Sequence, residues 1–99
     1  MDKKRVVITG MGTVNPLGNS VDATWKALMR GESGITEISR FDPSNIASRI
    51  AGEIKDFDYT VYFDGDMRKK AKRMDLFCHY AAAAAAEATE QARLKEISR

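Results

Sequence analysis

The stretch Arg5–Asn19, RVVITGMGTVNPLGN, combines an apolar run, two glycines one residue apart and a proline-containing turn. The β-branched residues Val6–Ile8 follow one another without a polar break, which is typical of a strand buried on both faces. Gly10 and Gly12 end this run, because residues without a Cβ tolerate positive φ and let a second backbone come close. Asn15-Pro16 then turns the chain, since the proline ring fixes φ. The stretch therefore predicts the first strand and turn of an α/β domain.

The glycines fit neither of the common nucleotide-binding loops. A dinucleotide-binding G-x-G-x-x-G loop needs a third glycine so that its helix can pack on the strand, but Asn15 occupies that position. A phosphate-binding G-x-x-x-x-G-K-S/T loop needs a lysine after its second glycine. Gly12 and Gly18 are one residue too far apart, and Asn19 follows them. The glycines are therefore interpreted as structural, and no cofactor-binding residue is predicted.

The composition is that of an ordinary soluble protein. Of the 99 residues, 43% are hydrophobic and 30% are charged, which excludes a disordered tail. The longest apolar run, the alanines at 81–86, is far shorter than the ~20 residues that span a bilayer. No apolar signal region precedes Val6, and one cysteine cannot form an internal disulfide, so a cytoplasmic location is expected. A net charge of +2 is too small to indicate a nucleic-acid partner by itself.

The segment after the turn predicts an amphipathic helix. Asn19 or Ser20 can cap its N-terminus, and Gly31 can end it because glycine tolerates the left-handed conformation. Its apolar positions recur at helical spacing and predict one buried face, made of Val21, Trp25, Leu28 and Met29. Trp25 is accordingly interpreted as a core residue and not as a ligand platform.

The middle of the chain predicts a turn and a short strand. Residues Gly34–Arg40 are interpreted as a connecting segment, and Phe41–Ser44 reads FDPS, a turn in which proline sets φ. From Arg49 to Lys55 the pattern alternates, with Ile50, Gly52 and Ile54 on one face and Arg49, Ala51, Glu53 and Lys55 mostly on the other. This alternation predicts a half-exposed strand.

A basic segment follows at Met67–Arg73, with five cations in six positions: Arg68, Lys69, Lys70, Lys72 and Arg73. On a helix capped by Asp66, Met67 and Ala71 fall on one face together with Met74 and can point inward. The cations then form a compact positive patch. A plain solvated helix face is one interpretation of such a patch, and a docking surface for an acidic partner is the other.

Asp75 can begin a further helix that runs to about Leu94, and its alanine tract allows close backbone packing. The pair Cys78-His79 on this helix is not interpreted as catalytic. Neighbouring side chains on a helix point about 100° apart, so the imidazole is badly placed to take the thiol proton. Cys78 is expected to be a core thiol and His79 a surface or packing residue. One cysteine and one histidine do not make a metal site.

Taken together, these motifs resemble the β-ketoacyl-acyl-carrier-protein synthases, and in particular their synthase II branch. That family opens with VVITGxGxVxPLGN and continues with W-x-x-L, G-x-SGI, FD, K-D-F and a basic stretch ending K-R-M-D-x-F-x-x-Y-A. The matching residues here run along the whole chain: Val6–Gly10, Gly12, Val14, Pro16–Asn19, Trp25, Leu28, Gly31, Ser33–Ile35, Phe41-Asp42, Lys55–Phe57, Lys72–Asp75, Phe77 and Tyr80-Ala81.

The resemblance implies a fold and an activity. It implies an α/β protein of the thiolase-like, layered α/β/α/β/α class, of which residues 1–99 are an incomplete part of the N-terminal domain. This part would be mostly helical, with the buried strand and the half-exposed strand described above. The full-length enzyme would be a homodimeric acyltransferase that joins an acyl group to malonyl units on acyl carrier protein. It would need no metal or dissociable cofactor. The family's catalytic cysteine and histidines match nothing in residues 1–99, so this chain alone is expected to be inactive.

The resemblance also gives the basic segment a partner, because these enzymes dock an acidic helix of acyl carrier protein here. Lys69, Lys72 and Arg73 are the best candidates for docking and Arg68 the next, whereas Lys70 lies where the related pattern often has an acid. Nucleic acid is a poorer partner, since five carboxylates between Glu53 and Asp66 would repel phosphates.

Two other classes share parts of this sequence. A Rossmann-type reductase would share VVITG but bind a nicotinamide cofactor through a further glycine motif. A non-catalytic chain-length-factor relative would keep this N-terminal sequence and still bind the carrier protein.

Overall fold

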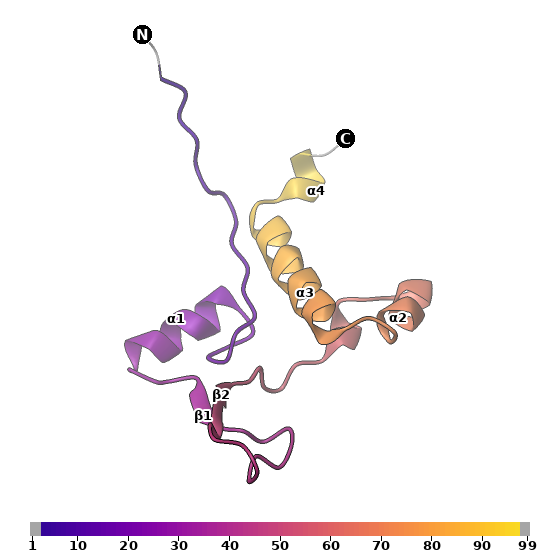
Figure 1. Ribbon diagram of the computed structural model, residues 1–99. Coiled ribbons are helices and arrows are strands. Elements are labelled where there is room, and N and C mark those ends of the chain that lie inside the picture. Colours follow the sequence, from indigo (N-terminus) through magenta and orange to yellow (C-terminus); the bar gives the residue numbers. More distant parts are fainter. Residues whose placement is uncertain (1–2, 98–99) are drawn as a thin grey trace.

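The computed structural model describes residues 3–97 and is mainly helical (Figure 1). In chain order the elements are α1 (Val21–Met29), β1 (Ile35–Glu37), β2 (Ile50–Gly52), a 3-10 turn (Tyr59–Val61), α2 (Gly65–Ala71), α3 (Leu76–Gln91) and α4 (Leu94–Ile97). None of the helices in this part of the chain is long and apolar enough to cross a membrane.

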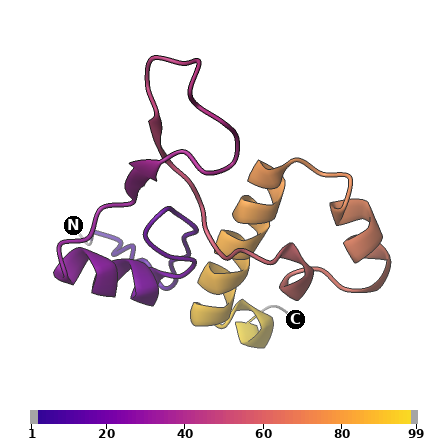
Figure 2. The same cartoon turned by 90° about the horizontal axis from the view of Figure 1, so that it is seen from below.

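These elements do not enclose a core of their own. The radius of gyration is 17.4 Å, whereas a compact domain of this length would have about 13 Å. The fully buried apolar residues in the described part of the chain are three alanines, Ala27, Ala71 and Ala83. The helices instead form an open arrangement, with α1 and α2 on opposite sides of α3 and the β1–β2 loop projecting outward (Figure 2). A chain of this shape exposes surfaces that a larger fold would cover.

The prediction of a strand at Val6–Ile8 that is buried on both faces is not met in this chain. The three side chains are 93%, 73% and 83% exposed, and the segment is extended but pairs with no strand of the described residues. Figure 1 shows it leading away from the helices toward the N-terminus. A central strand needs a neighbour on each side, and β1 and β2 pair with each other. The missing partners, and not the local sequence, leave these residues in solvent.

The turn and helix that follow were predicted correctly. Asn15 and Gly18 exchange backbone hydrogen bonds of 3.0 and 3.1 Å, which closes the turn around Pro16. Ser20 caps α1, because its Oγ accepts a hydrogen bond from the backbone N–H of Ala23 at 3.1 Å. Gly31 ends the helix with a positive φ of 72°.

The apolar face of α1 is exposed, which contradicts the assignment of Trp25 to the core. Trp25 is 61% exposed and Met29 is 70% exposed, and Ala27 is the buried residue of this helix. The amphipathic pattern correctly predicted the helix and its apolar stripe. No element of the described chain covers that stripe.

A two-stranded antiparallel hairpin joins β1 to β2, with Ile35 opposite Gly52. The sequence predicted the second strand and missed the first, because β1 lies in the segment interpreted as a connection. The predicted face is also reversed: Ile50 is 58% exposed, whereas Glu53 is 7% exposed. Burial of Glu53 is possible because its carboxylate accepts hydrogen bonds from the backbone N–H of Ser39 and of Arg40.

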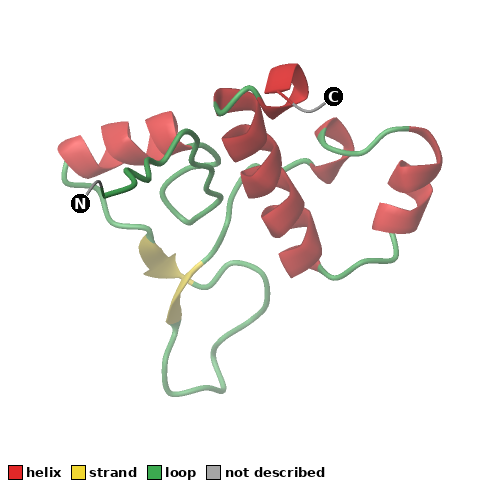
Figure 3. Ribbon diagram, turned by 90° about the horizontal axis from the view of Figure 1, so that it is seen from above, coloured by secondary structure: helices red, strands yellow, loops and turns green. Residues whose placement is uncertain are grey.

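The N-terminal segment packs against α3, a contact that the sequence analysis did not predict, although both segments lack bulky side chains. A Cβ added to Gly12 would overlap the carbonyl oxygen of Ala84, and one added to Gly10 would overlap that of Ala88. The glycines therefore act by removing side chains from a backbone-to-backbone contact. Figure 3 shows α3 as the longest helix, with the loops of the N-terminal segment beside it.

Candidate functional site

The basic surface, defined as Arg68, Lys69, Lys70, Lys72 and Arg73, is presented by α2 and the turn after it. All five residues are exposed. The helix begins after Asp64 and not at Asp66, with no side-chain hydrogen bond at its cap. Ala71 is completely buried, as the helical pattern predicted, but Met67 on the same stripe is 46% exposed. The five charges lie together within two helical turns, and the acids nearest to them in sequence are Asp66 and Asp75.

Arg68 differs from the other four cations because its side chain is already bound. Its Nε donates to the carbonyl oxygen of Phe63 at 3.0 Å, and its Nη2 donates to that of Thr60 at 2.9 Å. These two bonds fasten the start of α2 to the 3-10 turn before it. Arg68 therefore places a positive charge on the surface and also holds the local backbone.

Lys69, Lys70 and Arg73 line one shallow hollow on the protein surface together with Asp66. The residues are spaced by three and four positions, so they share one side of the helix and its following turn. The family resemblance ranked Lys70 below its neighbours. The structure nevertheless places Lys70 beside Lys69 and Arg73, two of the three strongest candidates. Lys72 is exposed but does not line this hollow. Helical spacing alone was the signal that could have grouped Lys70 with Lys69 and Arg73.

Two carboxylates that precede α2 in the sequence, those of Glu53 and Asp58, accept hydrogen bonds from fixed donors. The pKa of Glu53 is lowered, first by the hydrogen bond from the Ser39 hydroxyl and then by backbone N–H groups. The pKa of Asp58 is lowered by the hydroxyl and the backbone N–H of Thr60. Both carboxylates are therefore stabilised as anions by fixed donors.

His79 lies under the basic surface and is buried, with 5% exposure. Its Nε2 is 2.6 Å from the carbonyl oxygen of Ala71, the last residue of α2. Cys78, the neighbour on α3, is a free and half-buried thiol. The two side chains thus do not form a nucleophile and base, in agreement with the sequence interpretation. In the described residues no cluster of histidine, cysteine and carboxylate side chains could hold a metal ion.

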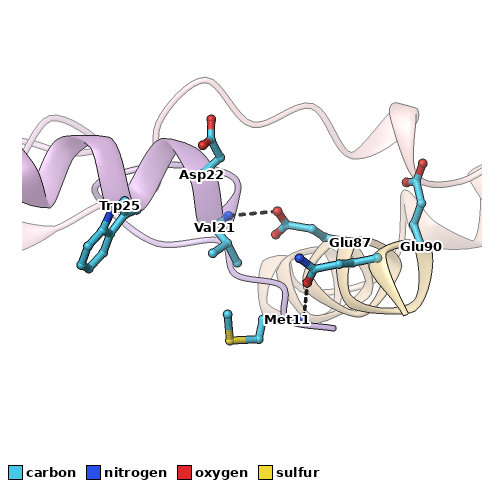
Figure 4. Close-up of a pocket in the computed structure, with 7 residues that line it drawn as sticks. Met11, Val21, Asp22, Trp25, Glu87 and Glu90 are labelled. Carbon is cyan, nitrogen blue, oxygen red and sulfur yellow. Dashed lines mark hydrogen bonds between the residues drawn. The ribbon is translucent and has the colours of Figure 1, made fainter. Parts of the chain in front are cut away.

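A second hollow lies between the N-terminal segment, α1 and α3 (Figure 4). Two of its polar side chains, those of Glu87 and Gln91, bind backbone. Glu87 accepts hydrogen bonds from the N–H groups of Thr13 at 3.0 Å and Val21 at 2.9 Å, and the side-chain oxygen of Gln91 accepts from Met11 at 2.8 Å. These bonds join α3 to the start of α1 and to the glycine segment. The polar side chains around this hollow therefore connect structural elements, and we assign them no catalytic role.

Comparisons with known proteins give the family of this chain. A family model described as the β-ketoacyl synthase N-terminal domain matches residues 3–99. The chain therefore belongs to the β-ketoacyl synthase family. This membership does not support the Rossmann-type reductase considered from the VVITG motif.

Its relatives include several proteins named 3-oxoacyl-[acyl-carrier-protein] synthase 2. The chain is 50% identical over 94 residues to that of Synechocystis sp. and 47% identical over 95 residues to that of Vibrio harveyi. It is 45% identical over 91 residues to that of Staphylococcus aureus strain COL. These matches cover 92–96% of this chain. The chain spans about a fifth of the length of the relatives, 21–22%.

Proposed function

We propose that this chain is the N-terminal part of a condensing enzyme of fatty-acid elongation. The full-length parent would transfer an acyl group from acyl carrier protein to its own cysteine, decarboxylate malonyl carrier protein and release a 3-oxoacyl product. The observation that carries this proposal is the similarity to 3-oxoacyl-[acyl-carrier-protein] synthases along nearly the whole chain. The parent would be a cytoplasmic homodimer that uses no dissociable cofactor, as the family resemblance implies.

The 99-residue chain alone would be inactive, because the family's catalytic cysteine and histidines match no residue in it. A direct test compares the purified full-length parent with the 99-residue chain in an assay for 3-oxoacyl carrier protein. The parent should form product and release carbon dioxide, and the chain should form none. A parent that binds carrier protein but forms no product would instead be the non-catalytic relative.

The basic surface would dock acyl carrier protein in this enzyme through Lys69, Lys72 and Arg73, with Arg68 beside them. Its exposed charges support this role, because the side chains of Lys69, Lys72 and Arg73 make no hydrogen bond or ion pair on the described part of the chain. Lys70, which lines the same hollow, adds to the positive field. Such a surface raises the rate of encounter with an acidic partner and makes it sensitive to salt.

The docking role is tested by reversing the charges of Lys69, Lys72 and Arg73 to glutamate in the full-length parent. The association rate with acyl carrier protein should fall at least about tenfold at low ionic strength, and the dependence on salt should weaken. Lys26→Glu is the matched control, because Lys26 is an exposed cation on α1, on the opposite side of α3 from α2 (Figure 1). Unchanged binding and an unchanged salt dependence in the triple variant would reject the docking surface.

A further inference from the structure

The hydrogen bond of His79 joins two helices at one buried point. His79 belongs to α3, and the carbonyl oxygen of Ala71 is at the C-terminal end of α2, 2.6 Å from Nε2. A carbonyl oxygen can only accept, so Nε2 carries the proton and donates it. Both residues are buried, with 5% exposure for His79 and 0% for Ala71. The same carbonyl oxygen also accepts from the backbone N–H of Met74 at 3.0 Å, which closes the turn after α2, and the bond from His79 is the one that reaches another helix.

The imidazole ring also holds the segment that leads into α2. The ring of Tyr59 stacks on it with centroids 4.6 Å apart and planes 13° apart. The ring of Phe63 meets its edge at 5.9 Å. The side chain of Arg68, on α2, donates hydrogen bonds to the carbonyl oxygens of Thr60 and Phe63, which lie in the same segment. The contacts of His79 therefore fasten both ends of the stretch 59–71 to α3.

Helix α2 needs such an anchor because little else holds it. It has seven residues, and helices shorter than about 12 residues are marginal without tertiary contacts. Asp64 at its N-cap makes no side-chain cap hydrogen bond. Ala71 is the residue of α2 that is fully buried. The five cations of the basic surface repel one another while the helix holds them close together, which further weakens α2.

We propose that His79 is a positioning residue for the basic surface: its Nε2–H bond to Ala71 holds α2 in the geometry in which its cations bind an acidic protein partner. This inference rests on the docking role proposed above. Loss of the bond would leave every charge in place, so long-range attraction would persist. The cations would no longer be held in one arrangement, and the bound complex would dissociate faster.

The test compares His79→Phe with His79→Gln in the full-length parent. Phenylalanine keeps a ring between Tyr59 and Phe63 but removes the donor, whereas glutamine keeps an N–H donor of similar reach. For His79→Phe, the KM for acyl carrier protein substrates should rise about fivefold, as for the loss of one net hydrogen bond, with kcat unchanged. Activity toward an acyl-pantetheine substrate without the carrier protein should not change. His79→Gln should stay within about twofold of the parent.

Hydrogen exchange provides a readout that does not depend on activity. In His79→Phe the amides of residues 68–72 should lose protection, while those of α1 keep theirs. If His79→Phe does not fold, His79→Gln and His79→Asn provide the same comparison between a variant that keeps the donor and one that loses it. The asparagine amide is shorter and cannot reach the carbonyl oxygen of Ala71. Asparagine should then behave as predicted for phenylalanine.

Three results would overturn the inference. These are an unchanged KM in His79→Phe, an equal loss of activity on the carrier-free substrate, and a glutamine variant no better than the phenylalanine one. The charge-reversal variant separates this inference from the docking proposal. If charge reversal weakens carrier binding and His79→Phe does not, the docking surface stands and the role of His79 fails. If charge reversal has no effect, the docking surface itself fails.

Discussion

The carboxylate of Glu87 on α3 accepts a hydrogen bond from the backbone N–H of Val21, the first residue of α1, with 2.9 Å between Oε2 and N (Figure 4). Its other oxygen accepts from the N–H of Thr13 at 3.0 Å. A carboxylate at this position also faces the positive end of the α1 dipole. One side chain thus binds the glycine segment, α1 and α3 together, although it is 66 residues from Val21 in the sequence.

We expect Glu87→Ala to destabilise the full-length parent by about 2 kcal/mol, because two part-buried N–H groups lose their acceptor. Glu87→Gln should destabilise the parent less, since the one amide oxygen of glutamine can still accept a hydrogen bond. Equilibrium unfolding in urea measures the difference. Glu90→Ala is the control, because Glu90 is an exposed acid one turn along the same helix. Equal losses for Glu87→Ala and Glu90→Ala would contradict the bridging role.

Gly12 should tolerate no side chain. Gly12→Ala is expected to destabilise the parent by about 2 kcal/mol or more, because the new Cβ would overlap the carbonyl oxygen of Ala84, which is backbone and cannot move aside. Thermal unfolding followed by circular dichroism measures this loss. Gly31→Asn is the comparison: Gly31 has a positive φ but open space around it, and asparagine adopts that conformation at low cost. A Gly12→Ala variant as stable as Gly31→Asn would disprove the close contact.

Glu53 should make the free energy of unfolding depend on pH in the acid range. Its folded pKa is lowered below the ordinary value of 4.5, chiefly by the Ser39 hydroxyl, so the anion is favoured by folding. A lowered carboxyl pKa adds stability that is complete above the ordinary value and is lost as the pH falls through the folded one.

The free energy of unfolding should therefore fall less steeply below about pH 4.5 in Glu53→Gln than in the unmodified parent. Asp58→Asn is the comparison and should change the acid profile less, because Asp58 is exposed and its partner Thr60 lies two residues away, so the unfolded chain can form the same bond. Parallel acid profiles for the parent and Glu53→Gln would count against the role of Glu53.

Lys70 should contribute to the attraction of an acidic partner as much as Lys69 does, because both line the hollow with Arg73. We expect Lys70→Ala to lower the association rate with acyl carrier protein about two- to threefold at low salt, and less at high salt. Stopped-flow mixing at several ionic strengths measures this. Lys26→Ala, on α1, should leave the rate unchanged. A Lys70→Ala variant that behaves like Lys26→Ala would place Lys70 outside the docking surface.

The local features of the fold could be predicted because each depends on neighbouring residues. The Asn15–Gly18 turn, the Ser20 cap and the positive φ at Gly31 follow from side chains that act within a few positions. The glycines and the alanine tract each indicated that a backbone could come close, because both lack bulky side chains. That these two segments meet each other was not predicted.

The failures concern residues whose surroundings are set by distant parts of the chain. Val6–Ile8 and Trp25 have the pattern of buried residues, yet the described chain contains nothing that covers them. Strand β1 was missed because three residues carry too little periodicity to reveal a strand. Glu53 was assigned to the wrong face because a buried carboxylate depends on donors that the alternation of a strand does not show.

The amino-acid sequence by itself determined the family, the helices, the turns and the presence of five clustered cations, because these follow from residue types and short spacings. The tertiary structure alone decided that Arg68 is bound to backbone and that His79 and Glu87 join separate elements. Such contacts depend on where the folded backbone places donors and acceptors that lie 5 to 74 residues apart, and sequence spacing carries no record of that placement.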